Sequence, residues 1–210
     1  MSCNSHCACP TKGGKFAPCH VALGRVALAS AFALAAYLAY PHAAQAATPQ
    51  DTVITSMAER NGVAADFKVQ GQGRLRFLGL HVYDAKLWAS QTITTANYTT
   101  TPLALALTYG RSLYGKLIAE RSLKEMRGVT AVSDAQASAW LAAMTRLFPD
   151  VQEGDQLTGV YQPGQRAVFW LNGKRLGEVD DPAFAPAFFG IWLDEKSSEP
   201  SLRNQLLGMP

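Results

Sequence analysis

The sequence predicts an α+β fold in which helices pack against one face of a large antiparallel sheet. Three observations support this class. Strand-like segments come first, two amphipathic helices follow them, and three short strands and short helical segments close the chain. Strands and helices that are segregated along a chain in this way are typical of an antiparallel sheet with helices layered on it. The 210 residues contain no internal repeat and no domain linker.

The first 46 residues have the pattern of an export signal. Basic residues precede the uncharged apolar run 26–40, and Ala44-Gln45-Ala46 is a small-x-small cleavage site. Fifteen apolar residues are fewer than the about 20 that span a bilayer, which favours cleavage over a permanent anchor. We therefore expect a signal peptide at 1–46, a mature domain at 47–210, and a periplasmic or secreted location after cleavage near Ala46.

Removal of this segment changes what the composition implies. All four cysteines lie before residue 47, and so do 3 of the 19 basic residues and none of the 16 acidic ones, which leaves 16 against 16. A near-neutral chain does not indicate nucleic-acid binding. His81 is the only histidine after residue 46, which argues against a multi-histidine metal site. We expect neither a metal nor a cofactor.

The first elements of the mature chain lead into one long strand-forming stretch, 71–90. Before it, the spacing of Val53, Ile54 and Met57 suits a short helix or an irregular strand. Within it, apolar residues alternate with Arg74 and Arg76 as in a half-buried strand. The alternation slips at Gly79, which predicts a bulge or sharp bend in one strand, or a tight link between two.

The segment 103–109 is the clearest strand of the sequence. Leu103, Leu105, Leu107 and Tyr109 share one face, and small residues occupy the other. We expect both faces to be covered, the small one by an element that packs closely.

Two helices are predicted next. The apolar spacing predicts a helix over 112–127 that ends at Gly128. Ser133 and Gln136 then form a capping box at the start of a second helix, which ends at Phe148-Pro149.

The chain then returns to strands at 156–161, 167–171 and 175–179. Asn172-Gly173 between the last two is a strong hairpin signal, since a type I′ turn needs positive φ at both central residues. The aromatic segment 188–194 is expected to pack on the core, with an apolar pocket edge as the alternative. A last helix, 202–207, is expected to be capped by Ser201 and to end at Gly208.

Two arginines and a tyrosine are the candidate ligand-binding side chains. Arg74 and Arg76 on a core strand, and Tyr114 at the start of a helix beside it, could converge on a carboxylate or an enolate. The alternative is a pair of exposed strand arginines and a packed tyrosine. His81 is best interpreted as a satisfied sheet residue, because no nucleophile elbow lies near it.

Three blocks of sequence carry a resemblance to a known family. They are GQG followed by LRFLGLHVYDAKLW, then YGRSLYGKLIAERSLKEM, and finally NGKRLGEVDDPAFAPAFFGIWLD with LRNQLLG. Together they resemble the chalcone isomerase-like family, in its exported bacterial branch, over about 67–208. The resemblance implies an open-faced β-sandwich with a ligand cleft between the sheet and the helices.

Plant enzymes of this family cyclise chalcones without a cofactor, using arginine, threonine, tyrosine and asparagine. Fatty-acid-binding relatives keep an arginine–tyrosine pair but do not isomerise. By resemblance the tyrosine matches Tyr114, whereas the arginine position falls on Leu75, the threonine on Leu78 and the asparagine on Arg121. Three of the four positions depart from the enzyme, so we do not expect chalcone isomerisation and assign no catalytic residue.

The sequence thus favours a periplasmic protein that binds a small apolar or carboxylate ligand, such as a fatty acid. One alternative is a cofactor-free isomerase or lyase, in which Tyr114 orients an enolate. Another is an assembly factor that presents the segment 188–194 to a protein partner. Contact with a membrane is expected only through the signal segment. The candidate ligand-binding residues are Arg74, Arg76, Tyr114 and Arg121.

Overall fold

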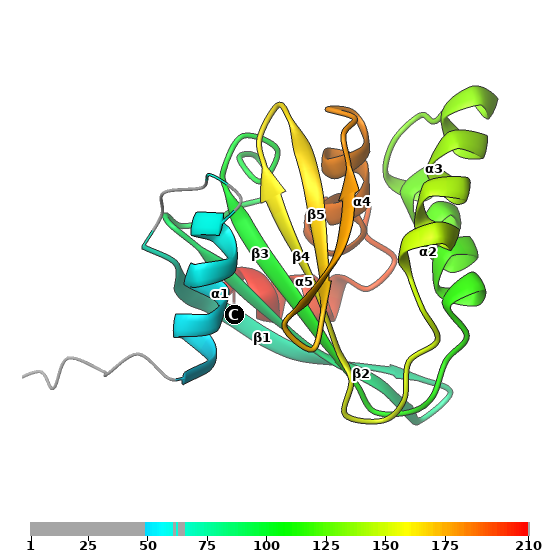
Figure 1. Cartoon of the computed structure of the whole chain (residues 1–210). Coiled ribbons are helices and arrows are strands. Elements are labelled where there is room, and N and C mark those ends of the chain that lie inside the picture. The colour runs from blue at the N-terminus through cyan, green and yellow to red at the C-terminus, as the bar shows by residue number, and fades with distance from the viewer. Residues whose placement is uncertain (1–48, 61, 63–65, 210) are drawn as a thin grey trace, which may run out of the picture. The chain divides into compact units, whose positions relative to one another are not determined.

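The core of the structure is a six-stranded antiparallel sheet whose strands pair in chain order (Figure 1). The computed structural model describes residues 49–60, 62 and 66–209, so the predicted signal peptide lies outside the described residues. The sheet is a meander in which each strand pairs with the next along the chain. Its strands are β1 (Lys68–Phe77), β2 (Leu80–Ala89), β3 (Leu103–Tyr109), β4 (Gln156–Gln162), β5 (Arg166–Leu171) and β6 (Lys174–Val179).

Helices cover both faces of this sheet. Four of them pack with the main hydrophobic core on one face, and α1 packs on the opposite face (Figure 1). The predicted α+β class, with a large antiparallel sheet and helices packed against one face, is confirmed, and α1 covers part of the opposite face in addition. None of the helices in the described part of the chain is long and apolar enough to cross a bilayer. The helices are α1 (Pro49–Arg60), α2 (Gly115–Val129), α3 (Asp134–Leu147), α4 (Phe184–Leu193) and α5 (Pro200–Leu207).

Strand β3 explains why two helical layers are needed. Its leucines join the main core, and Ala104 and Ala106 join a second cluster with Ile54 and Met57 of α1. Larger side chains of other strands, among them Trp88 and Trp170, complete this second cluster. The predicted covering of both faces is confirmed, and the segment around Val53 is a helix rather than a strand.

The long stretch 71–90 is a hairpin rather than one bent strand. Phe77 pairs with Leu80 across a two-residue turn, Leu78-Gly79, whose φ angles are 49° and 80°. A register shift follows Leu75 and marks a bulge. The tight link that the sequence left open is therefore the correct alternative, with a bulge beside it.

The boundaries of α3 are predicted correctly, whereas α2 begins and ends later than the predicted range 112–127. Ser133 accepts a hydrogen bond from the Gln136 backbone, and the reciprocal bond completes the capping box of α3. By contrast, Gly128 lies inside α2, which continues to Val129. Gly128 is helical here because it does not adopt the left-handed conformation that ends a helix.

Helix α5 ends as expected and begins differently. Gly208 is left-handed, with φ of 67°, and closes the helix. The helix begins at Pro200 after Glu199, so the predicted Ser201 cap is wrong. Proline supplies the start instead, since its missing N–H is not needed in the first turn.

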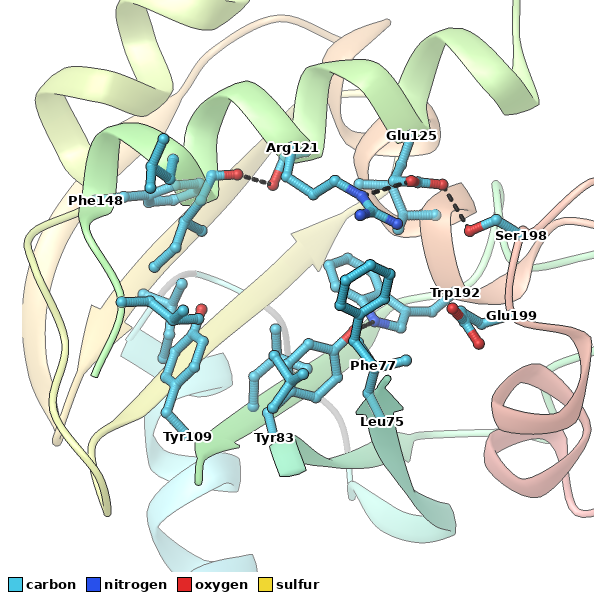
Figure 2. Close-up of a pocket in the computed structure, with 18 of the residues that line it drawn as sticks. Leu75, Phe77, Tyr83, Tyr109, Arg121, Glu125, Phe148, Trp192, Ser198 and Glu199 are labelled. Carbon is cyan, nitrogen blue, oxygen red and sulfur yellow. Dashed lines mark hydrogen bonds and ion pairs between the residues drawn. The ribbon is translucent and has the colours of Figure 1, made fainter. Parts of the chain in front are cut away.

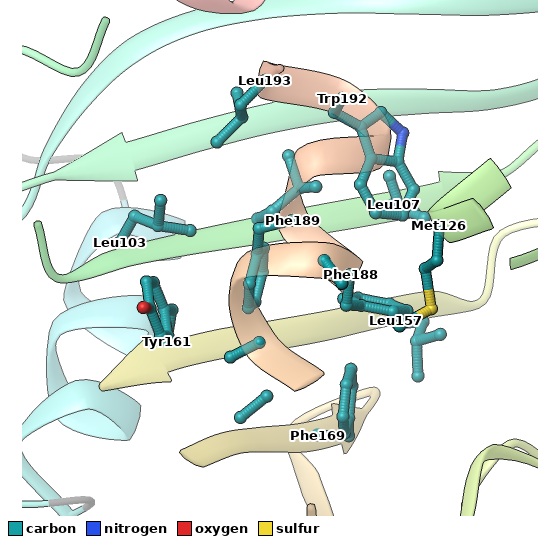
Figure 3. Packing of buried hydrophobic residues seen from close by; sticks show 14 of the residues in the cluster. Leu103, Leu107, Met126, Leu157, Tyr161, Phe169, Phe188, Phe189, Trp192 and Leu193 are labelled. Carbon is teal, nitrogen blue, oxygen red and sulfur yellow. The ribbon is translucent and has the colours of Figure 1, made fainter. Parts of the chain in front are cut away.

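Helix α4 is the most deeply buried helix of the described chain. Phe188, Phe189 and Trp192 are buried against β3, β4 and β5, and the Phe188 ring meets the Phe169 ring edge-on at 5.1 Å (Figure 3). Strand β4 has Gly159 at the contact, where a Cβ atom would lie 3.1 Å from Phe189. The segment 188–194 is thus core, and its buried aromatic side chains offer no face to a protein partner.

Candidate ligand-binding cavity

A cavity of about 480 Å³ lies between the sheet and helices α2 and α4 (Figure 2). Most of its wall is apolar. Strands β1 to β3 provide Leu75, Tyr83 and Leu107, α2 provides Ile118, and α4 provides Trp192. Pockets of roughly 300–1,000 Å³ with apolar walls and a few polar groups are typical of small-molecule sites.

Two tyrosines of the sheet form one side of the cavity. The rings of Tyr83 and Tyr109 meet edge to face, with centroids 6.1 Å apart. The Tyr83 hydroxyl accepts a hydrogen bond of 2.9 Å from the indole nitrogen of Trp192. The Tyr109 hydroxyl has no hydrogen-bond partner among the residues that the structure describes. Burial raises the pKa of both phenols, so both are neutral at physiological pH.

Charged residues stand on the other side, along α2. The Arg121 Nε donates to Glu125 Oε1 at 2.7 Å, and the second Glu125 oxygen accepts from the Ser198 hydroxyl, also at 2.7 Å (Figure 2). Arg121 and Glu125 are one helical turn apart, the spacing at which opposite charges meet. Arg111 and Glu199 also line the cavity. The site is therefore an apolar chamber with a charged rim.

The comparisons with known proteins fit this architecture. A family model described as chalcone isomerase-like matches residues 50–208. The chain belongs to the chalcone isomerase-like family. Among solved structures, the fatty-acid binding protein AtFAP1 of Arabidopsis thaliana is similar, with a TM-score of 0.53 and 13% identity over 67% of this chain and 86% of that one. This identity supports the shared fold alone. A search of curated proteins found no match.

Of the four predicted ligand-binding residues, this chalcone isomerase-like structure places only Arg121 in the cavity wall. Arg74 forms two hydrogen bonds to Asp84, at 2.6 and 3.1 Å, and Arg76 donates to the Gly79 carbonyl at 3.3 Å. Leu75 between them faces the cavity, and side chains alternate between the faces of a strand. Both arginines are thereby directed away from the ligand chamber.

Tyr114 is also outside the cavity. It immediately precedes α2, and 68% of its surface is exposed. The residue after it, Gly115, donates its backbone N–H to Asp150 at 2.8 Å, which fixes the start of the helix. Tyr114 therefore does not meet the two β1 arginines around one ligand, and it does not face an enolate bound in this cavity. Leu78, at the family's threonine position, lies in the hairpin turn.

Tyr83, Tyr109 and Arg111 line the cavity but were not predicted from the sequence as site residues. A signal for Tyr109 was present, because it shares a strand face with Leu107, which also lines the cavity. Tyr83 was obscured by the bulge, which changes the phase of β2 between the turn and the tyrosine. Trp192 was expected in the core or at a pocket edge, and it occupies both positions.

The described residues contain no group of three histidine, cysteine, aspartate or glutamate side chains that could hold a metal ion. His81 lies 3.3 Å from Asp84, on the side of the sheet that carries Arg74. Asp84 is shared with Arg74, and none of these three side chains lines the cavity. The chemistry of the cavity is that of apolar walls, phenol donors and guanidinium groups.

Proposed function

We propose that the protein binds a small, mostly apolar ligand with an acidic head group, such as a fatty acid, in the cavity between the sheet and α2. The proposal is carried by one observation, a chamber of about 480 Å³ with an apolar wall and a charged rim. Burial of an alkyl chain in such a chamber is favourable by about 0.8 kcal/mol for each methylene group. The fold similarity to a protein described as fatty-acid binding supports the same ligand class.

The head group is proposed to lie at the rim, near Arg111 and Arg121. Arg111 has no carboxylate partner among the described residues. Arg121 uses its Nε on Glu125, and its two terminal nitrogens make no hydrogen bond within the described chain. A guanidinium with free N–H groups is well suited to a carboxylate. The carboxylates of Glu125 and Glu199 would repel an acidic head group. The head group is therefore expected to contact the guanidinium groups of Arg111 and Arg121 rather than these two residues.

The experiment is a comparison of two ligands that differ only in the head group. Delipidated protein is titrated with a long-chain fatty acid and with the alcohol of the same length, and both affinities are measured by calorimetry. We expect the acid to bind more tightly. The Arg111→Gln, Arg121→Gln double variant should bring the acid to the affinity of the alcohol, a loss of about tenfold or more.

Arg74→Gln is the matched control for the charge, because Arg74 lies on the other side of the sheet. It should leave both affinities unchanged. Equal binding of acid and alcohol by the wild-type protein would contradict the placement of the head group. Failure of both ligands to bind would contradict the proposed function itself.

A second variant tests the chamber rather than its rim. Ile118→Phe on α2 adds bulk to the cavity wall and should weaken the acid and the alcohol equally. Leu141→Phe on α3 is the control, since Leu141 is also partly buried but does not line the cavity. Equal effects of the two substitutions would argue that binding occurs elsewhere.

The export signal expected at 1–46 would place this binding in the periplasm or outside the cell. The supporting observations are the apolar run 26–40 and the small-x-small site that ends at Ala46. Fractionation of cells that produce the full chain, followed by N-terminal sequencing, tests this expectation. A chain that begins at Ala47 and leaves the cytoplasm is the expected product. A chain that keeps its first residues and stays in the cytoplasm would contradict it.

A further inference from the structure

The turn between β1 and β2 carries a leucine where the backbone favours asparagine or glycine. Leu78 has φ of 49° and is 86% exposed. The two-residue turn between β5 and β6 has the same backbone conformation but carries the residues that favour it, since Asn172-Gly173 has φ of 48° and 81°. A left-handed conformation is unfavourable for leucine and well tolerated by asparagine. Leu78 is thus an exposed apolar side chain at a backbone position that is unfavourable for leucine.

Leu78 is the centre of an exposed apolar surface. We call the residues Phe77 to Leu80 the hairpin tip. Phe77 is 54% exposed and Leu80 is 56% exposed. Phe77 also lines the cavity (Figure 2). Leu117 of α2 lines it as well and is 55% exposed. The apolar surface of the tip is therefore continuous with the mouth of the ligand cavity.

Positive charge accompanies this apolar surface. Arg76 adjoins the hairpin tip, Arg111 lines the cavity with Phe77, and neither arginine has a carboxylate partner in the described part of the chain. Glu199 is an acid of the cavity wall without a basic partner among the described residues, and it offsets the charge of Arg111 there but not that of Arg76 at the tip. Every acidic residue of β2 and α2 is already paired. These pairs are Asp84 with Arg74, Glu120 with Lys116 and Glu125 with Arg121.

The shape of the tip distinguishes between possible occupants. A stable protein interface buries about 800 Å² on each partner, which a two-residue turn does not provide. A membrane interface requires less, because a few apolar side chains can enter the boundary between head groups and acyl chains while basic residues contact anionic lipids. Three apolar side chains with Arg76 and Arg111 beside them have this composition.

We propose that the hairpin tip inserts into the interface of an anionic lipid membrane and brings the cavity mouth to the acyl chains. The folded domain would then contact the membrane itself, in addition to the membrane contact expected from the signal segment. Membrane binding by the tip stands by itself, whereas transfer of a lipid into the cavity rests on the proposed function.

The test is flotation of the purified protein with vesicles of phosphatidylethanolamine and phosphatidylglycerol, compared with vesicles of phosphatidylcholine alone. We expect binding to the anionic vesicles, weakened by salt, and little binding to the zwitterionic ones. Leu78→Asn should weaken binding about tenfold. Its thermal midpoint should be equal to or above that of the wild type, because Asn172 shows that this backbone accepts asparagine. Met209→Asn, at another exposed apolar residue, is the control and should bind like the wild type.

The outcomes separate this proposal from the proposed function. The proposal that the tip binds membranes is contradicted if the wild type does not float with anionic vesicles. It is also contradicted if Leu78→Asn binds these vesicles as well as the wild type does. A concentration-dependent dimer that Leu78→Asn disrupts, without vesicle binding, would replace the membrane by a second copy of the chain. Vesicle binding without fatty-acid binding in solution would uphold the docking and contradict the proposed function.

Discussion

The indole nitrogen of Trp192 donates a hydrogen bond of 2.9 Å to the hydroxyl of Tyr83, and this bond joins α4 to β2 at the cavity wall. Tyr83→Phe removes the acceptor and leaves the indole N–H of a buried tryptophan unpaired. An unpaired buried donor costs about 1–3 kcal/mol, so we expect the free energy of unfolding to fall by that amount. Urea denaturation followed by tryptophan fluorescence measures it.

Tyr114→Phe is the matched control for this substitution. Its hydroxyl lies on a side chain that is 68% exposed, and exposed substitutions usually change stability by less than about 0.5 kcal/mol. If both variants lose the same free energy, the bond between Trp192 and Tyr83 contributes nothing specific.

The two cavity phenols also predict an alkaline limit to stability. Burial raises the pKa of Tyr83 and Tyr109 in the folded protein above the ordinary value of about 10. Above pH 10 the unfolded chain loses these protons first, so the unfolded state binds fewer protons and stability falls as pH rises. Below pH 10 the contribution is complete. Unfolding free energies measured from pH 8 to pH 11.5 should show this decline.

The double variant Tyr83→Phe, Tyr109→Phe should flatten the decline without abolishing it. Tyr98 and Tyr161 also have a raised pKa because they are buried, and they keep part of the slope. An unchanged slope in the double variant would show that the cavity phenols ionise as they do in the unfolded chain.

Local signals in the sequence were sufficient for most of the fold. The Asn172-Gly173 turn and the Ser133 capping box depend on residues within four positions of each other, and the structure contains both. The β1–β2 turn shows where such signals end. Leu78 has no turn preference, so the sequence marked a break at Gly79 without deciding between a bend and a link.

The candidate site was less predictable because it depends on which strand face the helices cover. Arg74 and Arg76 were natural choices for a carboxylate, but Leu75 between them faces α2 and the arginines do not. Neighbours in sequence cannot determine this, since a one-residue change of register exchanges the two faces. Arg121 lies in the cavity wall because it is three residues after Ile118 on the same face of α2. Tyr109 lies there because it is two residues after Leu107 on the same face of β3.

The capping box of α3 gives a prediction of stability that is independent of any ligand. Ser133→Ala removes the oxygen that accepts from the Gln136 backbone N–H, and loss of such a cap costs about 1 kcal/mol. Chemical denaturation should show this decrease. Ser138→Ala, at an exposed position inside the same helix, should be neutral or slightly stabilising because alanine favours helix. The reverse ranking of the two variants would contradict the role of the cap.

The Arg74–Asp84 pair predicts an acid limit to stability and no effect on ligand binding. The Arg74 hydrogen bond lowers the pKa of Asp84 in the folded protein, so its contribution is present above about pH 4 and is lost as pH falls below that value. Both side chains are almost half exposed, so water screens the pair and its contribution to stability is small.

Asp84→Asn tests both parts of this prediction. At pH 7 the variant should be slightly less stable than the wild type, and the difference should vanish toward pH 2, where the wild-type carboxylate is also neutral. Its affinity for a fatty acid should equal that of the wild type, because Asp84 and Arg74 do not line the cavity. An affinity reduced as strongly as in Arg121→Gln would instead place the polar cluster of β1 and β2 in the binding site.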